Sequence, residues 1–242
     1  MTDEPIGLPS DGRVVPIRAL DLRVDPAPHP LEQANAEAIA AHWVREQAAN
    51  PALYNGRLIL QRQIRHEDAE VRAIGHEASF ASFLWWRSQS DLSGACHLFG
   101  YPVVISGDGA LIAIEMAPHT ANPGQVYFAA GSLDPSDVVE GRCDLGGNMR
   151  REVLEETGLD LMTAQADTRM YASYRPYKLT LFQIFRFAEP ADVLLERITE
   201  FARRAHEQEI SRAVAIRGPD RTAHRYGLAM LPILDWYFRV PL

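Results

Sequence analysis

The chain has 242 residues, of which 47% are hydrophobic and 23% are charged, and this balance excludes a wholly disordered protein. Its formal net charge of -8 disfavours broad binding to a nucleic-acid backbone, and no apolar run reaches the roughly eighteen residues of a membrane span. The proline-dotted start also lacks a signal-peptide core, so we expect a cytoplasmic globular protein whose partner is neither nucleic acid nor membrane.

Residues 1–95 are predicted to form an extension to the main domain. Prolines interrupt the first part of this segment, and Pro51 stops a run of apolar residues at helical spacing. The predicted elements of the extension are a strand at 14–24, a helix at 31–50, a strand at 57–65 and either a strand or a helix at 70–86. We expect the extension to act in substrate specificity or in dimerisation, and a homodimer is left open.

Residues 96–242 are predicted to form the main domain, with an α/β fold. Gly107, Asp108 and Gly109 join two apolar runs, which is typical of a β-hairpin. The further predicted elements are a strand at 126–130, a long loop to about Gly147, a glutamate-rich helix, strands at 168–174, 178–187 and 209–217, and helices at 192–208 and 224–238. Strands that alternate with helices predict a sheet packed between helices.

The stretch RREVLEETGL at 150–159 carries the clearest chemical signal. Glu152, Glu155 and Glu156 stand at i, i+3 and i+4 and share one face of the predicted helix, where like charges repel. A solvated surface helix ending at Gly158 is the alternative, but no lysine or arginine lies four residues after any of these glutamates. Clustered carboxylates suit hard cations, so the pattern predicts a site for Mg²⁺ or Mn²⁺.

This stretch resembles the second half of the Nudix box, which reads arginine, glutamate, apolar, any, glutamate, glutamate, any, glycine, apolar. The matching residues are Arg151, Glu152, Val153, Glu155, Glu156, Gly158 and Leu159. The first half of the box, a glycine, five residues, a glutamate and seven residues before the arginine, is altered. Without a gap, Cys143 and Asp137 would occupy the glutamate and glycine positions, and neither fits.

The better alignment pairs Gly131 with the box glycine and Asp137 with the box glutamate. Thirteen residues rather than seven then separate Asp137 from Arg151, an insertion of six that the turn glycines of VVEGRCDLGG can accommodate as a loop. The resemblance implies a Nudix-like α/β/α sandwich with a mixed sheet. It also implies a Nudix-type pyrophosphohydrolase that cleaves a diphosphate bond in a nucleoside diphosphate linked to another moiety, with a nucleotide sugar as one candidate. The Gly131 carbonyl would be a metal ligand.

The resemblance and the spacing together imply roles for the side chains of the box. Glu152 and Glu156, one helical turn apart, would bind the divalent cation. Glu155 would share the metal or accept a proton from water. Arg151 would orient one of these carboxylates through a pairing with Asp137.

Two features outside the box are candidates for the same site. Glu207 and Glu209 precede a predicted strand, and Glu209 is the one we select as a general base, with a solvated glutamate as the alternative. The stretch YASYRPYK at 171–178 has residue types that suit stacking on a base or pairing with phosphate, although strand packing explains its tyrosines equally well.

A second hypothesis belongs to a different class. The altered first half of the box fits a catalytically weak Nudix-fold module that binds or senses a nucleotide without turning it over. The complete set of glutamates favours the enzyme.

Overall fold

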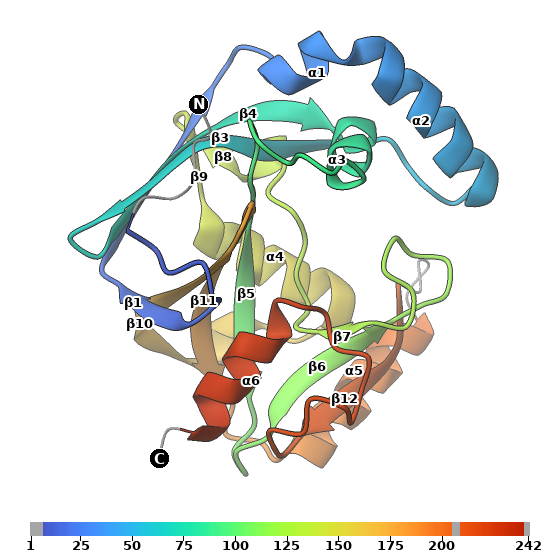
Figure 1. Ribbon diagram of the computed structural model, residues 1–242. Helices are drawn as coiled ribbons and strands as arrows, with labels where there is room; N and C mark the ends of the chain where they lie inside the picture. The colour runs from blue at the N-terminus through green and yellow to red at the C-terminus, as the bar shows by residue number, and fades with distance from the viewer. Residues whose placement is uncertain (1–6, 205–208, 240–242) are drawn as a thin grey trace.

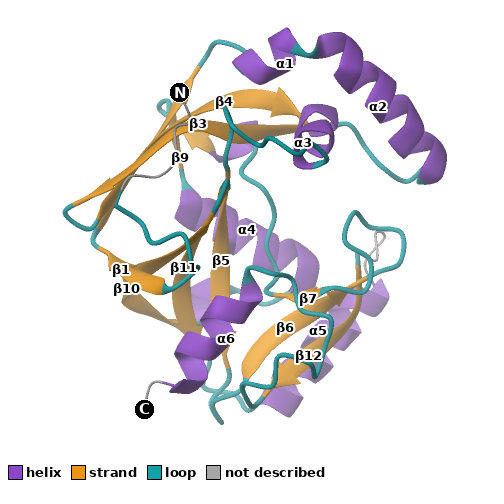
Figure 2. Cartoon of the chain, viewed as in Figure 1, coloured by secondary structure: helices purple, strands orange, loops and turns teal. Residues whose placement is uncertain are grey.

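The computed structural model describes residues 7–204 and 209–239, and two β-sheets organise them (Figures 1 and 2). The strands of the larger sheet, in spatial order, are β1 (Val14–Ile17), β10 (Gln165–Arg175), β11 (Lys178–Arg186), β5 (His97–Ile105), β6 (Leu111–Met116) and β12 (Ile210–Ile216), with β7 (Val126–Tyr127) paired to β6. Strands β11 and β5 run parallel and the other pairs are antiparallel, so this sheet is mixed.

The second sheet joins the N-terminal segment to the loop that precedes the glutamate-rich helix. Its strands, in spatial order, are β3 (Arg57–Glu67), β4 (Glu70–Ser79), β2 (Ala19–Asp25), β9 (Arg142–Cys143) and β8 (Val138–Val139). Strand β2 is parallel to β4 and antiparallel to β9.

Helices cover both faces of the larger sheet. The helices are α1 (Pro30–Ala34), α2 (Ala36–Ala49), α3 (Phe80–Arg87), α4 (Leu145–Thr157), α5 (Ala191–Arg204) and α6 (Met230–Arg239). Helices α4 and α5 contact each other and lie behind the larger sheet, whereas α6 lies in front of it (Figure 1). Helix α3 packs on β3 and β4 and supports α2. The predicted α/β fold is confirmed.

One hydrophobic core runs through the larger sheet and includes residues of the N-terminal segment. Ile17, Leu22 and Ile59 pack in the same cluster as Phe128 and Phe182. Because β1 belongs to the larger sheet and β2 to the second, residues before position 96 contribute to both sheets. The division into 1–95 and 96–242 stays a prediction.

A smaller hydrophobic cluster lies under α3. It is formed by Leu58, Leu60, Ala78, Phe83, Trp86 and Ala95. This cluster fixes α3 against β3 and β4, and α3 in turn carries Arg87 at its end.

The N-terminal elements differ in detail from the sequence expectation. The single strand expected at 14–24 is two strands, because the backbone N–H of Arg18 bonds to the carbonyl of Ala69 at 2.7 Å and the chain passes from one sheet to the other. The helix expected at 31–50 is divided at Asn35, whose side chain donates to the Leu31 carbonyl. The stretch 70–86 contains both alternatives, a strand and then a helix that Ser79 caps.

The remaining elements agree in kind but shift in their limits. The short strand expected at 126–130 covers only two residues, and the last helix begins at Met230 rather than at residue 224. The end of the helix expected at 192–208 lies outside the described residues. No helix among 7–204 and 209–239 is long and apolar enough to cross a membrane.

Candidate active site

Helix α4 begins and ends at residues that the sequence marks for those positions. The Asp144 side chain caps its start by accepting a hydrogen bond from the Gly147 N–H at 2.8 Å. Gly158 ends it with a left-handed φ of 69°, and its N–H bonds to the Leu154 carbonyl. The helix buries Met149 and Val153 in the core, which places the glutamates beside the segment that follows β7.

Glu152 lies directly against Gly131. A Cβ atom at position 131 would overlap the Glu152 carboxylate, so glycine allows this close approach. The Glu152 side chain is 13% exposed, and burial raises its pKa to about 7. The charge of Arg151 opposes this rise, whereas Glu155 and Asp137 add to it.

Glu156 lies one helical turn further on and has the most perturbed carboxylate of the site. Burial raises its pKa well above the ordinary value, and the charges of Glu152 and Glu209 raise it further. A hydrogen bond from the Ala130 backbone acts in the opposite direction. The Oε2 atom of Glu156 is buried and has no hydrogen-bond partner within the described ranges. A proton or a bound cation would satisfy this oxygen.

Arg151 connects the helix to the preceding loop through both of its terminal nitrogens. Its Nη2 lies 3.0 Å from Oδ2 of Asp137 and 3.4 Å from Oδ2 of Asp134. Its Nη1 lies 2.8 Å from Oε1 of Glu152 and 3.2 Å from Oε2 of Glu155. The pairing of Arg151 with Asp137 is therefore present as expected, and the same guanidinium also holds Glu152.

Asp137, which takes the place of the glutamate in the altered first half of the box, is buried and held by hydrogen bonds. Its Oδ2 accepts hydrogen bonds from Asn148 Nδ2 at 2.9 Å and from the Asp134 N–H at 3.0 Å. Sequence reasoning missed Asn148 and Asp134. The signal for Asn148 was its position three residues before Arg151, on the same helix face.

The inserted residues leave the site and join the second sheet. They form the β8–β9 hairpin, where the Gly141 carbonyl accepts from the Val24 N–H at 2.9 Å and Arg142 pairs with Asp21 at 3.1 Å. The loop expected up to Gly147 is thus partly regular structure, because N-terminal strand β2 offers a pairing edge to it.

The two candidate proton acceptors have different surroundings. Glu155 is exposed and already bound by Arg151. Glu209 precedes β12, where its carbonyl accepts from the Ala117 N–H at 2.8 Å, and its side-chain charge acts on Glu156. Glu207 lies outside the described residues.

Tyr127 adds a group that sequence reasoning missed. Burial raises its pKa above the ordinary value, and the charges of Glu156 and Glu209 add to the rise. Tyr127 therefore stays a neutral hydroxyl beside the carboxylates at neutral pH. The strand that carries Tyr127 has only two residues, which is too short for an alternating pattern to predict which side chain faces the carboxylates.

The residues of the site fit a divalent cation in part. No three His, Cys, Asp or Glu side chains among the described residues stand in an arrangement that already suits a metal ion. Glu152 and Glu156 nevertheless have raised pKa values, and one Glu156 oxygen lacks a partner. Oxygen donors of this kind suit Mg²⁺ or Mn²⁺, and a cation bound there would remove the repulsion between them.

No protein-family model and no curated protein matches the sequence. Among solved structures, the chain is similar to the DR0079 protein of Deinococcus radiodurans, with a TM-score of 0.45 and 13% sequence identity. The similarity covers 76% of this chain and 99% of that one.

Proposed function

We propose that this protein is a Nudix-type pyrophosphohydrolase, a metal-dependent enzyme that cleaves a diphosphate bond in a nucleoside diphosphate linked to another moiety. The observation that supports this most strongly is the buried, unpartnered Oε2 atom of Glu156 beside the Glu152 carboxylate. Glu152 is paired with Arg151, but Glu156 has no ion pair within the described residues, and a buried carboxylate without one destabilises a fold. Function is the physical reason to keep it.

Glu152 and Glu156 would hold Mg²⁺ or Mn²⁺, with the Gly131 carbonyl as a further ligand. A bound cation of this kind neutralises phosphate oxygens and lowers the pKa of water. Arg151 orients Glu152, because its guanidinium is anchored on the buried carboxylate of Asp137.

The attacking water must also lose a proton to a carboxylate. We assign this role to Glu209, because Glu155 is already engaged by Arg151 whereas Glu209 has no ion pair within the described part of the chain. A positioned general base contributes about 100- to 10,000-fold to the rate. Glu155 remains the second candidate for this step.

Turnover by matched variants tests the proposal. Nucleotide sugars, dinucleotides and coenzyme A derivatives are supplied with Mg²⁺ or Mn²⁺, and the nucleotide released by cleavage of the diphosphate bond is measured for each substrate. We expect Glu156→Gln to lower kcat by about 100-fold or more, while Glu196→Gln on an exposed position of α5 keeps wild-type turnover. Equal turnover by wild type and Glu156→Gln would remove this mechanism.

Metal binding is measured separately by thermal unfolding. A ligand at 100 times its Kd stabilises the native state by about 2.7 kcal/mol. We therefore expect Mn²⁺ to raise the Tm of the wild type and of Glu196→Gln, and to raise the Tm of Glu156→Gln much less. If nucleotides stabilise the wild type but no product forms from any substrate, the chain is a binding or sensing module instead.

A further inference from the structure

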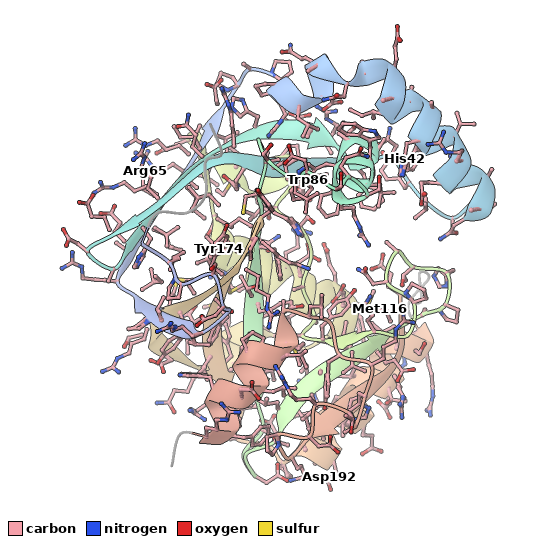
Figure 3. The ribbon with its side chains drawn as sticks, viewed as in Figure 1. His42, Arg65, Trp86, Met116, Tyr174 and Asp192 are labelled. Carbon is pink, nitrogen blue, oxygen red and sulfur yellow. The ribbon has the colours of Figure 1, made fainter. Side chains whose placement is uncertain are left out.

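A cavity of about 310 Å³ lies between helices α2 and α3 and the loop that joins β6 to β7. Residues of the two helices line one side, and Thr120 and Ala121 of the loop line the other. Figure 3 labels His42 on the helix side of this space and Met116, just before the loop, on the opposite side. The cavity is large enough to receive a small molecule.

A hydrogen bond ties the two sides of the cavity together. Asn50, the residue that ends α2, donates from Nδ2 to the His119 carbonyl of the loop at 3.0 Å. The other side-chain atom of Asn50, Oδ1, accepts from the Ala52 N–H at 3.2 Å, which fixes the direction of the amide. The loop is thus attached to α2, and the cavity between them is a built feature of the fold.

The same loop is attached to the carboxylate site at both of its ends. Its first residue, Ala117, donates its N–H to the Glu209 carbonyl at 2.8 Å. Its other end leads into β7, and Ala130, three residues after that strand, bonds through its backbone to Glu156. The cavity therefore borders the proposed catalytic carboxylates.

A side-chain contact joins the same two regions. Asn122, which follows the cavity residue Ala121, forms a hydrogen bond with Tyr127. Tyr127 is buried, and the charges of Glu156 and Glu209 act on it. Tyr127 thus lies between the loop of the cavity and the carboxylates.

Two opposite charges line the cavity without pairing. Glu46 lies in the last turn of α2 and Arg87 is the last residue of α3, and within the described chain they form no ion pair with each other. Oε1 of Glu46 lies 3.5 Å from Nε2 of His42, one helical turn earlier, and the Arg87 guanidinium lies 5.7 Å from the centroid of the Phe83 ring. A ligand between Glu46 and Arg87 can therefore contact both.

This charge balance selects the chemical class of the ligand. An anion in the cavity would be repelled by Glu46 and a cation by Arg87, so the pair favours a neutral group. A hydroxyl group suits both side chains, because its O–H donates to a carboxylate and its lone pairs accept from a guanidinium. Ser88 and Thr120 add acceptors, since their own hydroxyl groups already donate to backbone carbonyls at 2.7 Å and 2.9 Å. The cavity thus favours a ligand with several hydroxyl groups.

The remaining lining fits a sugar ring better than a nucleobase. Ala49, Leu53 and Leu84 offer an apolar surface to the C–H groups of a ring. Among the described residues that line the cavity, His42 alone has an aromatic ring, and its side chain is only 12% exposed. Because nucleobases are held largely by stacking on aromatic side chains, this lining does not suit a base.

The charged residues also have ordinary structural explanations. His42 and Glu46 form a pair at i and i+4 that supports α2, and Arg87 complements the dipole at the end of α3. These explanations account for each residue on its own helix. They do not account for the meeting of opposite charges at one cavity whose two sides Asn50 ties together.

We propose that this cavity binds the sugar ring of a nucleotide sugar, with Glu46 and Arg87 as the residues that hydrogen-bond to its hydroxyl groups. The attachment of the sugar to a nucleoside diphosphate rests on the proposed function, whereas the sugar pocket itself rests on the charges and lining of the cavity. Helices α2 and α3 of the N-terminal segment then determine the substrate, and the carboxylates of α4 act on its diphosphate.

Calorimetry that compares each nucleotide sugar with its own nucleoside diphosphate tests the pocket. The protein is titrated with UDP-glucose, UDP-N-acetylglucosamine, GDP-mannose, UDP and GDP, in EDTA and again with Ca²⁺ as a hard cation. We expect at least one nucleotide sugar to bind about 10- to 100-fold more tightly than its diphosphate, the range for one hydrogen bond to a charged group. Glu46→Gln and Arg87→Gln should each lower this ratio by about 10-fold and leave the affinity for the diphosphate unchanged.

Matched variants control for charge and for folding. Glu37→Gln and Arg45→Gln, at exposed positions of α2 outside the cavity, should keep the wild-type ratio. Ala49→Leu adds volume to the cavity from an exposed position and removes no charge, so it should abolish the preference for the sugar. This variant tests the pocket even if a charge variant fails to fold.

Each result is decisive for one of the two proposals. If no nucleotide sugar binds more tightly than its diphosphate in either condition, the sugar pocket is overturned whatever the enzyme assay shows. An equal loss of affinity for the sugar and for the diphosphate in Glu46→Gln and Arg87→Gln also overturns it. A preference for the sugar that these variants remove, with no turnover of any substrate, keeps the pocket and removes the hydrolase.

Discussion

Nη2 of Arg151 lies 3.0 Å from Oδ2 of Asp137, a residue that is only 6% exposed. The anchor matters because the other terminal nitrogen of the same guanidinium holds Glu152 at 2.8 Å. A buried carboxylate thus sets the position of a carboxylate at the proposed metal site. Only a planar group with several donors can bridge the two in this way.

Replacing Arg151 by lysine is expected to loosen this link. A single ammonium cannot reach both carboxylates in the same geometry, so we expect a loss of about 1–3 kcal/mol in the free energy of unfolding and a lower kcat. Urea unfolding and turnover measure the two effects. Arg150→Lys on the same helix is the control, since Arg150 is exposed and lies 3.7 Å from Asp144. Wild-type stability and kcat in Arg151→Lys would contradict the anchoring role.

The raised pKa of Glu152 predicts how stability depends on pH. Its pKa rises from an ordinary 4.5 to about 7 on folding, so the folded state holds the proton more tightly than the unfolded state. Stability from this group is fully present below pH 4.5 and is lost as pH rises through about 7. Without metal, Glu152→Gln should therefore match the wild type at pH 4.5 and exceed it by about 2–3 kcal/mol at pH 8.

Urea unfolding in EDTA at several pH values measures this difference. Glu196→Gln should show no such dependence, because its side chain is exposed on α5. A stability difference between Glu152→Gln and wild type that stays constant from pH 4.5 to pH 8 would rule out a buried, protonated Glu152.

Adding one methyl group at Gly131 is expected to disturb catalysis more than folding. The new Cβ would overlap the Glu152 carboxylate, and the flexible side chain can move away at small cost. Displacements of about 1 Å at an active site can reduce rates by 100-fold, so we expect Gly131→Ala to lose about 10- to 100-fold in kcat. Gly218→Ala, where a Cβ meets nothing within 4 Å, should keep wild-type activity. Full activity of Gly131→Ala would show that the position of the Glu152 carboxylate does not matter for catalysis.

Glu209 is expected to affect the rate without affecting metal binding. As a general base it would contribute about 100- to 10,000-fold, so Glu209→Gln should lower kcat within this range. The rise in Tm with Mn²⁺ should remain, since Glu209 is not among the proposed metal ligands. Unchanged kcat in Glu209→Gln would show that another group is the general base. Glu155→Gln is then the variant to measure.

Some parts of the fold could be predicted from local patterns. The strands β3, β10 and β11 and the helices α4 and α5 appear where alternation or helical spacing places them. Gly158 ends α4 because the left-handed cap is a local requirement that glycine meets without strain. The division of residues 14–25 between two sheets could not be predicted, because strand pairing depends on distant partners.

The candidate site likewise has features that local sequence patterns predict and features that only tertiary contacts determine. The sequence alone placed three glutamates on one helix face, since neighbours at i+3 and i+4 follow from the pitch of the helix. Tertiary structure decided that Asp137 and Asn148 support Arg151 and that the insertion pairs with β2. These contacts join residues whose distance in sequence gives no information on distance in space, because the packing of the whole core brings them together.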